Sequence, residues 1–197
     1  VSPTGNDTSG DGSQGKPWVS LNKAWTLVSA GDTVYLRGGT YYYGRQSLTG
    51  KDGSKERHIR VLAYPGEKPS IKKAGSYANI GWPRAILNIS GDYIHIRGLE
   101  ISYNTQENSE GYYGLILVNG SHNIFELLDV HHNGGTGISI EYNSTDNLIL
   151  NCDVHHNADP LTIDKYGNAG GIGFSHIPAG LHNTVQGCRL WLNSDDG

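Results

Sequence analysis

The sequence predicts an all-β fold in which one chain winds into a single-stranded parallel β-helix with three short strands per coil. The first observation is a hexad that recurs and always ends in Asn, at residues 99–104, 128–133, 152–157 and 188–193. The terminal Asn residues are 29, 24 and 36 residues apart. Repeats of about 20–50 residues are typical of solenoids, whose units bury their apolar faces only by stacking on one another.

Two further sets of segments align with these asparagine hexads. Segments 114–117, 137–140 and 171–174 each begin with Gly and occupy one strand position. A second position contains Ile96, Phe125, Ile149 and Val185, and the hexads supply the third. Alternation within each strand then turns one set of side chains inward and the other outward. Gly accounts for 28 of the 197 residues, which suits the frequent turns of such a coil.

The N-terminal part of the chain predicts a lead-in and a cap. Residues 1–18 are rich in Gly, Ser, Asp and Pro and predict irregular structure. Residues 20–29 predict one short α-helix, with Ser20 as its N-cap and Gly31 as its terminator. Its apolar stripe consists of Leu21, Ala24, Trp25 and Val28. We expect this helix to cover the first coil, whose strand edges would otherwise promote aggregation.

Residues at matching positions of successive hexads are expected to stack inside the coil. The four terminal Asn side chains would form a ladder in which each amide bonds to the next, because buried polar groups need partners. This structural role is favoured over a ligand-binding one. Cys152 and Cys188 also match. Two small buried thiols are favoured there over a disulfide, since parallel neighbours rarely present disulfide geometry.

Composition limits the classes of partner. A chain of 197 residues fits a single domain over residues 1–197. The net charge of -4 argues against nucleic acid, which requires a basic face. No apolar run approaches the roughly 20 residues needed to cross a bilayer, so no membrane partner is expected.

The alignment also locates an insertion. Three residues separate Asn133 from the next strand position at Gly137, whereas residues 158–170 separate Asn157 from Gly171. This excursion contains Asp159, Asp164, Lys165 and Tyr166. Long excursions from a regular scaffold are where solenoids carry function.

Two other groups of residues have more than one interpretation. His131 is expected to lie near His155, and solvated imidazoles flanking the ladder are favoured over a metal-binding pair. The run Tyr41–Tyr43 favours packing at the edge of the coil over stacking on sugar rings.

The sequence resembles known families at both ends. Residues 1–7 (VSPTGND) and 31–41 (GDTVYLRGGTY) resemble secreted right-handed parallel β-helix proteins. Residues 188–197 (CRLWLNSDDG) resemble the pectate lyases of polysaccharide lyase family 9. The resemblance implies a right-handed coil and a secreted, extracellular polysaccharide lyase that is monomeric at full length. Its partner would be an acidic polysaccharide.

The same resemblance implies a calcium site. In that family the Asn-Ser-Asp-Asp-Gly-aromatic-Asp tract binds a catalytic calcium, so Asp195 and Asp196 are the implied metal ligands. The third Asp of the tract and the lysine that serves as base fall beyond Gly197, so no catalytic residue is assigned within the chain. Gly170 stands where the family has a calcium-binding Asp on the preceding coil. This member either binds calcium differently, through the 158–170 insertion, or has lost the site.

The chain ends at Gly197, where its own register requires another strand. We therefore expect further coils and a cap to follow, and the fragment alone to be inactive.

We expect a lyase that cleaves uronate-containing polysaccharide such as pectate by calcium-assisted β-elimination. One alternative is a non-catalytic β-helix that binds glycans or attaches to surfaces, which Gly170 favours. A second is a glycoside hydrolase, because Ser175–His176 and the paired aspartates loosely resemble inverting polygalacturonases. In those enzymes the His motif follows the paired Asp, whereas here it precedes it.

Overall fold

The computed structural model describes residues 1–162 and 169–194, and its strands form three parallel sheets. Sheet A contains β1 (Thr33–Leu36), β4 (Ile59–Ala63), β7 (Ile94–Arg97), β10 (Ile124–Glu126), β13 (Asn147–Leu150) and β16 (Asn183–Gln186). Sheet B contains β2 (Gly39–Tyr43), β5 (Pro69–Lys73), β8 (Glu100–Ser102), β11 (Asp129–His131), β14 (Asp153–His155) and β17 (Arg189–Trp191). Sheet C contains β3 (Gln46–Leu48), β6 (Arg84–Ile89), β9 (Tyr112–Val118), β12 (Ile138–Glu141) and β15 (Ile172–Ser175).

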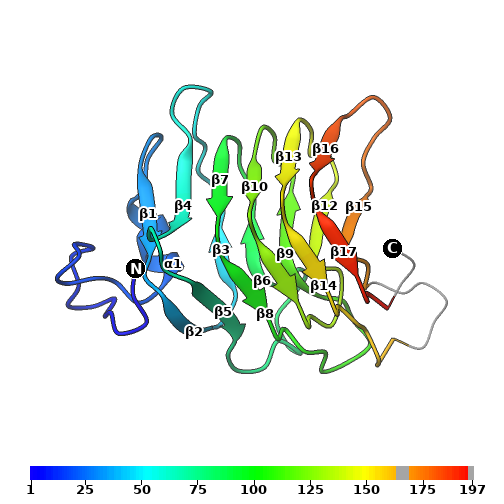
Figure 1. Cartoon of the computed structure of the whole chain (residues 1–197), viewed down its shortest axis with the longest axis horizontal. Helices are drawn as coiled ribbons and strands as arrows, with labels where there is room; N and C mark the ends of the chain where they lie inside the picture. Colours follow the sequence, from blue (N-terminus) through cyan, green and yellow to red (C-terminus); the bar gives the residue numbers. More distant parts are fainter. Residues whose placement is uncertain (163–168, 195–197) are drawn as a thin grey trace.

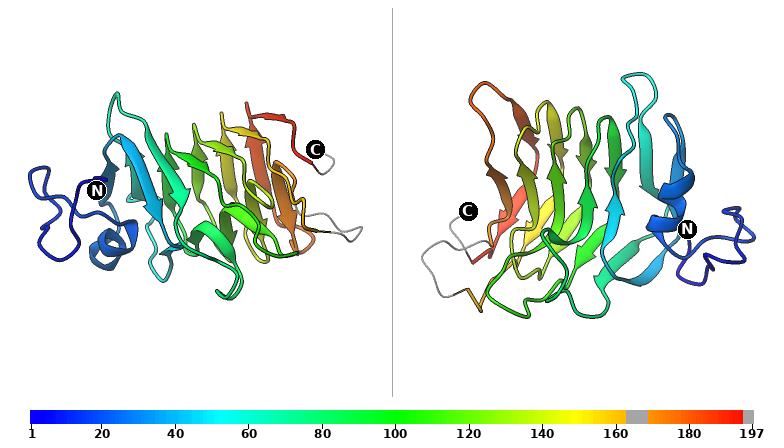
Figure 2. Two further views of the ribbon diagram at one scale, coloured as in Figure 1. Left: turned by 90° about the horizontal axis from the view of Figure 1, so that it is seen from below. Right: turned by 180° about the vertical axis from the view of Figure 1, so that it is seen from behind.

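Each strand pairs with the strand three further along the chain, so the chain visits the three sheets in turn and forms stacked coils (Figure 1). The views from below and behind show the same elongated stack, with the N-terminal residues at one end and the last coil at the other (Figure 2). A parallel β-helix with three strands per coil is therefore confirmed.

The predicted register is also confirmed. In sheet A, Phe125 pairs with Ile96 on one side and with Ile149 on the other. In sheet C, Ile138 pairs with Leu115 and with Ile172. The hexads stack in sheet B, where Val130 lies between Ile101 and Val154.

The asparagine ladder joins these coils at the end of sheet B. The backbone N–H of Asn104 donates to Oδ1 of Asn133 at 3.1 Å. Asn133 donates to Oδ1 of Asn157 through its backbone N–H at 3.1 Å and its Nδ2 at 3.0 Å. Asn157 does the same to Asn193 at 3.2 and 3.0 Å. Asn133 and Asn157 are buried, so these bonds satisfy side-chain groups that water cannot reach. The buried side-chain amide of Asn104 donates instead to the carbonyl oxygens of Arg84 and Tyr113, both at 2.8 Å.

A second ladder, which the sequence analysis missed, lies at the start of sheet A. Asn123 donates to Oδ1 of Asn147 from its backbone N–H and Nδ2, at 2.9 and 3.0 Å. Asn147 donates to Oδ1 of Asn183 at 3.2 and 2.8 Å. Asn123, Asn147 and Asn183 are 24 and 36 residues apart, the same spacings that separate Asn133, Asn157 and Asn193 in the first ladder. These equal spacings could have predicted the second ladder from the sequence.

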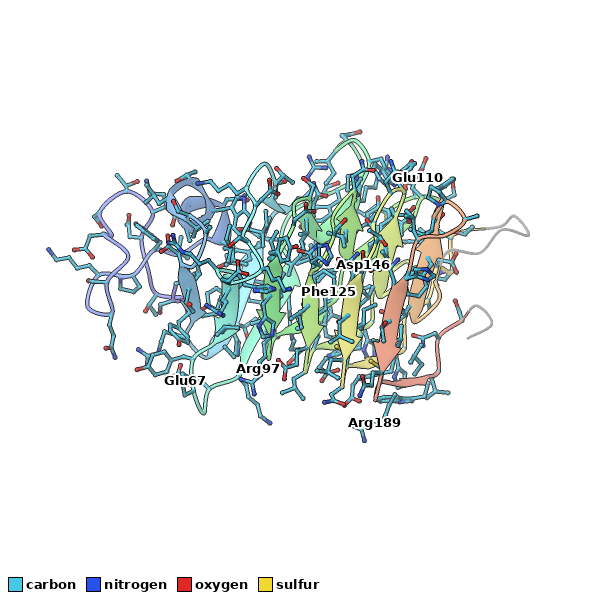
Figure 3. All side chains as sticks on the ribbon, turned by 90° about the horizontal axis from the view of Figure 1, so that it is seen from above. Glu67, Arg97, Glu110, Phe125, Asp146 and Arg189 are labelled. Atoms are coloured by element: carbon cyan, nitrogen blue, oxygen red, sulfur yellow. The ribbon has the colours of Figure 1, made fainter. Side chains whose placement is uncertain are left out.

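The interior of the stack is apolar. Inward-facing Val, Leu and Ile side chains from all three sheets form one core, and Phe125 lies fully buried within it (Figure 3). Cys152 and Cys188 are free thiols on adjacent coils, and the backbone N–H of Cys152 lies 3.4 Å from Sγ of Cys188. The predicted stacked thiols are confirmed, with Cys152 buried and Cys188 half-buried.

The N-terminal helix α1 (Leu21–Leu27) packs against sheet C. All four residues of its predicted stripe are buried, and Oγ of the N-cap Ser20 accepts from the backbone N–H of Lys23 at 3.0 Å. The indole Nε1 of Trp25 donates to the carbonyl oxygen of Thr49 at 2.9 Å. The prediction that Gly31 terminates this helix is wrong. Val28 is the C-cap, because its backbone turns to an extended conformation at φ -65°, ψ 150°.

The irregular lead-in is confirmed, and the predicted packing of the tyrosine run is confirmed for two of its three residues. Residues 1–18 contain neither helix nor strand. Tyr41 and Tyr43 are buried in the core, whereas Tyr42 is 69% exposed. In residues 1–162 and 169–194, no helix combines the length and apolarity required to cross a membrane.

Candidate functional site

The turn that leads from sheet B into sheet C carries the residues that the sequence singled out. Gly170 lies just before β15, and its carbonyl oxygen accepts from the backbone N–H of Gly137 at 3.0 Å. Asp195 and Asp196 lie outside the described residues, as do Asp164, Lys165 and Tyr166 of the insertion. Ser194, directly before Asp195, donates its backbone N–H to the carbonyl oxygen of Asn157 at 2.9 Å.

Position 170 has room for a side chain. A Cβ built on Gly170 would meet no atom within 4 Å, and its backbone is not left-handed. Neither sterics nor backbone strain therefore requires Gly here. An Asp, which the family resemblance implies at this position, would fit here. Gly170 differs from it in supplying no carboxylate to the turn.

Asp159 brings a carboxylate to the same turn from the insertion. Ala158 and Ser194 occupy equivalent positions of adjacent coils, since each donates its backbone N–H to the ladder Asn one coil back. The side chain of Asp159 is 8% exposed, and its Oδ1 accepts from Oγ of Ser194 at 3.2 Å. The insertion thus places an acidic group beside the residue that precedes Asp195.

These residues do not by themselves form a calcium site. Calcium takes about 6–8 oxygen ligands. Among residues 1–162 and 169–194, no group of three or more His, Cys, Asp or Glu side chains is placed to hold a metal ion. The described part of the turn supplies Asp159 and Ser194, and the remaining carboxylates that the family resemblance implies lie at Asp195 and Asp196.

A carboxylate–imidazole pair lies on the outer face of sheet C. Ile138 and Ile140 face the core, so alternation turns Ser139 and Glu141 outward. Oγ of Ser139 donates to Oε1 of Glu141 at 2.6 Å. On the next coil, Nδ1 of His176 lies 3.4 Å from Oε2 of Glu141 and 2.9 Å from Oγ of Ser175.

Aromatic rings border this pair. The ring of Tyr142 stacks on His176 with centroids 5.1 Å apart and meets Trp82 edge-on at 5.8 Å. Trp82 is 47% exposed. Glu141 itself is only 5% exposed, so this surface combines a shielded carboxylate with accessible rings.

The paired histidines of two hexads lie close together, as predicted. The rings of His131 and His155 are parallel at 4.8 Å, and those of His132 and His156 are parallel at 5.1 Å. The rings of Tyr103, His132 and His156 form one wall of a groove of about 390 Å³, which Gln106 and Leu161 also line.

The repeated coils, the two asparagine ladders and the polar groups on the outer faces define a parallel β-helix protein whose candidate sites lie on the outside of the coil. The chain belongs to the family described as Pel9A-like, right handed beta helix region, which it matches over residues 1–197. The right-handed coil that the resemblance implied is thereby confirmed.

The chain is similar to pectate lyases from bacteria and fungi. Pectate lyase L of Dickeya dadantii is 32% identical over 206 residues, which cover 100% of this chain and 45% of that protein. Pectate lyase PEL9 of Emericella nidulans is 30% identical over 201 residues, covering 100% of this chain and 48% of that protein. This chain therefore spans about half the length of these relatives.

The chain is also similar in structure to lyases whose structures have been solved. The crystal structure of pectate lyase Pel9A superposes with a TM-score of 0.77 at 28% identity, covering 100% of this chain and 48% of that one. A rhamnogalacturonan lyase superposes with a TM-score of 0.76 at 24% identity, covering 99% of this chain and 51% of that one, and supports the fold alone.

Proposed function

We propose that the protein containing this chain is a secreted, monomeric polysaccharide lyase that cleaves acidic, uronate-containing polysaccharide such as pectate by calcium-assisted β-elimination. The observation that carries the proposal is membership of the Pel9A-like family over the whole chain, together with relatives named as pectate lyases at about 30% identity. The net charge of the chain is -4, so it repels a polyanion, and a cation that bridges the two supports binding.

The proposed reaction needs two kinds of group. A base removes the proton on C5 of a uronate, the bond from C4 to the leaving sugar oxygen breaks, and a C4–C5 double bond forms. The C5 proton is a poor acid, and a cation on the sugar carboxylate stabilises the negative charge that develops. A lysine beyond residue 197 is the proposed base.

We assign the calcium ligands to Asp195 and Asp196, with Asp159 in place of the carboxylate that Gly170 lacks. Two observations support Asp159: it is buried at the same turn, and it bonds to Ser194. When bound there, calcium would neutralise the sugar carboxylate.

The test uses the full-length protein that contains this chain. Ultraviolet absorbance of unsaturated uronate should rise when polygalacturonate and calcium are added, and chelation should abolish the rise. Asp195→Asn and Asp159→Asn should each raise the calcium concentration that gives half-maximal activity, while Asp146→Asn, a change far from the turn, should not. Absence of any rise on polygalacturonate, rhamnogalacturonan and alginate contradicts the lyase.

The same assay separates two rivals. The absence of a carboxylate at Gly170 favours a glycan-binding protein, which would retain polysaccharide without cleaving it. The contacts among Glu141, Ser175 and His176 favour a hydrolase, which would produce reducing ends without unsaturated uronate.

A further inference from the structure

Three aromatic rings on the outside of the coil form the wall of the groove described above. Tyr103, His132 and His156 each precede a ladder Asn, so they come from three successive coils. The ring of His132 is nearly parallel to the other two, and its centroid is 5.1 Å from each of theirs. The wall therefore follows the axis of the coil, along which successive strands are about 4.8 Å apart.

The groove continues up to the turn to which we assign the calcium. Ala158 and Pro160 line the groove, whereas Asp159 between them turns its carboxylate to Oγ of Ser194. Leu161 adds an apolar side chain that is 47% exposed. A polysaccharide chain that leaves the calcium turn on this side therefore enters the groove.

The charge of the groove suits an anionic chain. None of the described residues that line it is acidic, although the net charge of the whole chain is -4. At the end far from the calcium turn, Nζ of Lys72 lies 4.8 Å from the centroid of the Tyr103 ring. Lys72 forms no ion pair in the described part of the chain. The nearby carboxylate of Glu100 accepts from the hydroxyls of Ser70 and Ser102 instead.

The outer ring of each histidine pair presents a hydrogen-bond acceptor. Nε2 of the inner ring, His155, donates to Oδ1 of Asp129 at 3.1 Å, because an ionised carboxylate only accepts. Nδ1 of His155 therefore holds a lone pair, and it accepts the hydrogen on Nδ1 of His156 at 2.7 Å. A neutral His156 then has its own lone pair on Nε2, which points away from His155.

The same arrangement recurs one coil earlier. The Nδ1 atoms of His131 and His132 are also 2.7 Å apart, and Nε2 of His131 lies 3.5 Å from Oε1 of Glu100. Burial lowers the pKa of His132, and the neighbouring imidazoles of His156 and His155 lower it further, so this ring is neutral near pH 7. In the described part of the chain both outer rings bond through Nδ1 alone, which leaves their Nε2 atoms available to a ligand in the groove.

We propose that this groove binds the uronate chain where it leaves the calcium turn, with sugar hydroxyls donating to Nε2 of His132 and His156 and a uronate carboxylate pairing with Lys72. The inference rests on the proposed function, because the calcium turn fixes where the chain enters. Carbohydrate-sized sites combine apolar and aromatic walls with a few polar groups that fix orientation, and the groove has this composition. The sugar units in the groove are not the ones that react, so the groove stabilises the bound substrate and the transition state equally.

The binding test uses the full-length protein, a galacturonate hexamer and a chelator, so that binding is measured without cleavage. Calorimetric titration at pH 7.5 should show that the wild-type protein binds the hexamer. The double variant His132→Phe/His156→Phe keeps the ring wall and removes both acceptors, so it should bind about tenfold more weakly. Phe fits these positions, because Tyr103 holds an aromatic ring at the matching position with φ 62°. An unaltered Tm shows that the double variant is folded.

A hexamer whose carboxyl groups are all methyl-esterified separates the two kinds of contact. Lys72→Gln should weaken binding of the acidic hexamer by about threefold and leave binding of the esterified hexamer unchanged, because the ester has no charge to pair. The double Phe variant should weaken binding of both hexamers, since their hydroxyls are the same. Equal effects of Lys72→Gln on the two hexamers would overturn the pairing of Lys72 with a carboxylate.

Two variants close to sheet A are the matched controls. His122 is exposed, has φ 58° and stacks on Tyr93 at 4.7 Å, so His122→Phe makes the same change at a different corner of the coil. Lys55 is exposed in the loop before β4, so Lys55→Gln removes one positive charge away from the groove. Neither control should change the affinity for either hexamer.

Lyase kinetics separate the groove from the reaction. On polygalacturonate with calcium, the double Phe variant should have a KM about tenfold higher and a kcat within about twofold of the wild type. If unsaturated uronate never forms while the hexamer binds as expected, the proposed reaction is wrong and the groove proposal stands. Wild-type protein that does not bind the hexamer, or a double Phe variant that equals the wild type in affinity and KM, overturns the groove proposal.

Discussion

Asn133 donates two hydrogen bonds to a single oxygen, Oδ1 of Asn157, one from its backbone and one from its side-chain amide. Both residues are buried, at 1% and 0% exposure. Asn157→Ala therefore leaves two donors without an acceptor, and each such group costs about 1–3 kcal/mol. We expect the free energy of unfolding to fall by about 3 kcal/mol, measured by urea denaturation.

Asn143→Ala is the control for this change. Asn143 is exposed and its two bonds to Asn119 are long, at 3.4 Å, so the loss should stay within about 0.5 kcal/mol. Equal losses in the two variants would mean that the ladder adds no more than a surface contact.

The coil was predictable because each coil repeats similar residues at matching positions of the sequence. The hexads fix the register of sheet B, and the Gly-initiated segments fix that of sheet C. The end of α1 was not predictable in this way, because the chain leaves the helix at Val28 by turning extended and Gly31 takes no part. The spacing of Asn123, Asn147 and Asn183 could have predicted the second ladder, but these residues do not belong to a recurring hexad.

The candidate sites were only partly predictable. Sequence spacing placed His131 beside His155, since stacked coils align matching positions. It did not place Nδ1 of His131 against Nδ1 of His132, because that contact depends on a left-handed residue after the strand. The proximity of Asp159 to Ser194 was likewise hidden by the length of the insertion, which says nothing about where its first residues fold.

Substitution by Ala should destabilise the protein at Gly137 and have little effect at Gly170. A Cβ on Gly137 would lie 2.5 Å from Cγ1 of Val154 and 2.8 Å from Nδ2 of Asn157, inside the packed core. Gly137→Ala should reduce the free energy of unfolding by about 3 kcal/mol through this overpacking. Gly170→Ala meets open space and should change it by less than about 0.5 kcal/mol. Urea denaturation of both variants measures the difference, and a larger loss at Gly170 would contradict the packing.

Glu107 should give the protein an acid-sensitive stability. Hydrogen bonds from Lys73 and Ser76 and from the backbone N–H of Tyr77 lower the pKa of Glu107 from 4.5 to about 2. As the pH falls, Glu107 is therefore protonated in the unfolded chain before it is protonated in the folded protein. The stabilisation of the folded protein by ionised Glu107 is full above pH 4.5 and is lost as the pH approaches 2.

Glu107→Gln removes this dependence. Its Tm should lie below that of the wild type at pH 7, and the two should converge as the pH falls toward 2. Glu110→Gln is the control, because Glu110 is more exposed and its ion pair with Arg84 is longer, at 3.4 Å. A Tm difference between wild type and Glu107→Gln that stays constant from pH 7 to pH 2 would exclude the carboxylate as its source.

Cys152 should be unreactive in the native protein. Burial raises the pKa of Cys152 from 9.0 to about 12, and the thiolate is the form that reacts. Three pKa units mean roughly 1,000-fold less thiolate at pH 8 than an unperturbed thiol would have. Iodoacetamide at pH 8 should therefore label Cys152 only after the protein is unfolded in urea, with mass spectrometry as the readout. Labelling of Cys152 in the native protein as fast as in urea would show that the core opens at this coil.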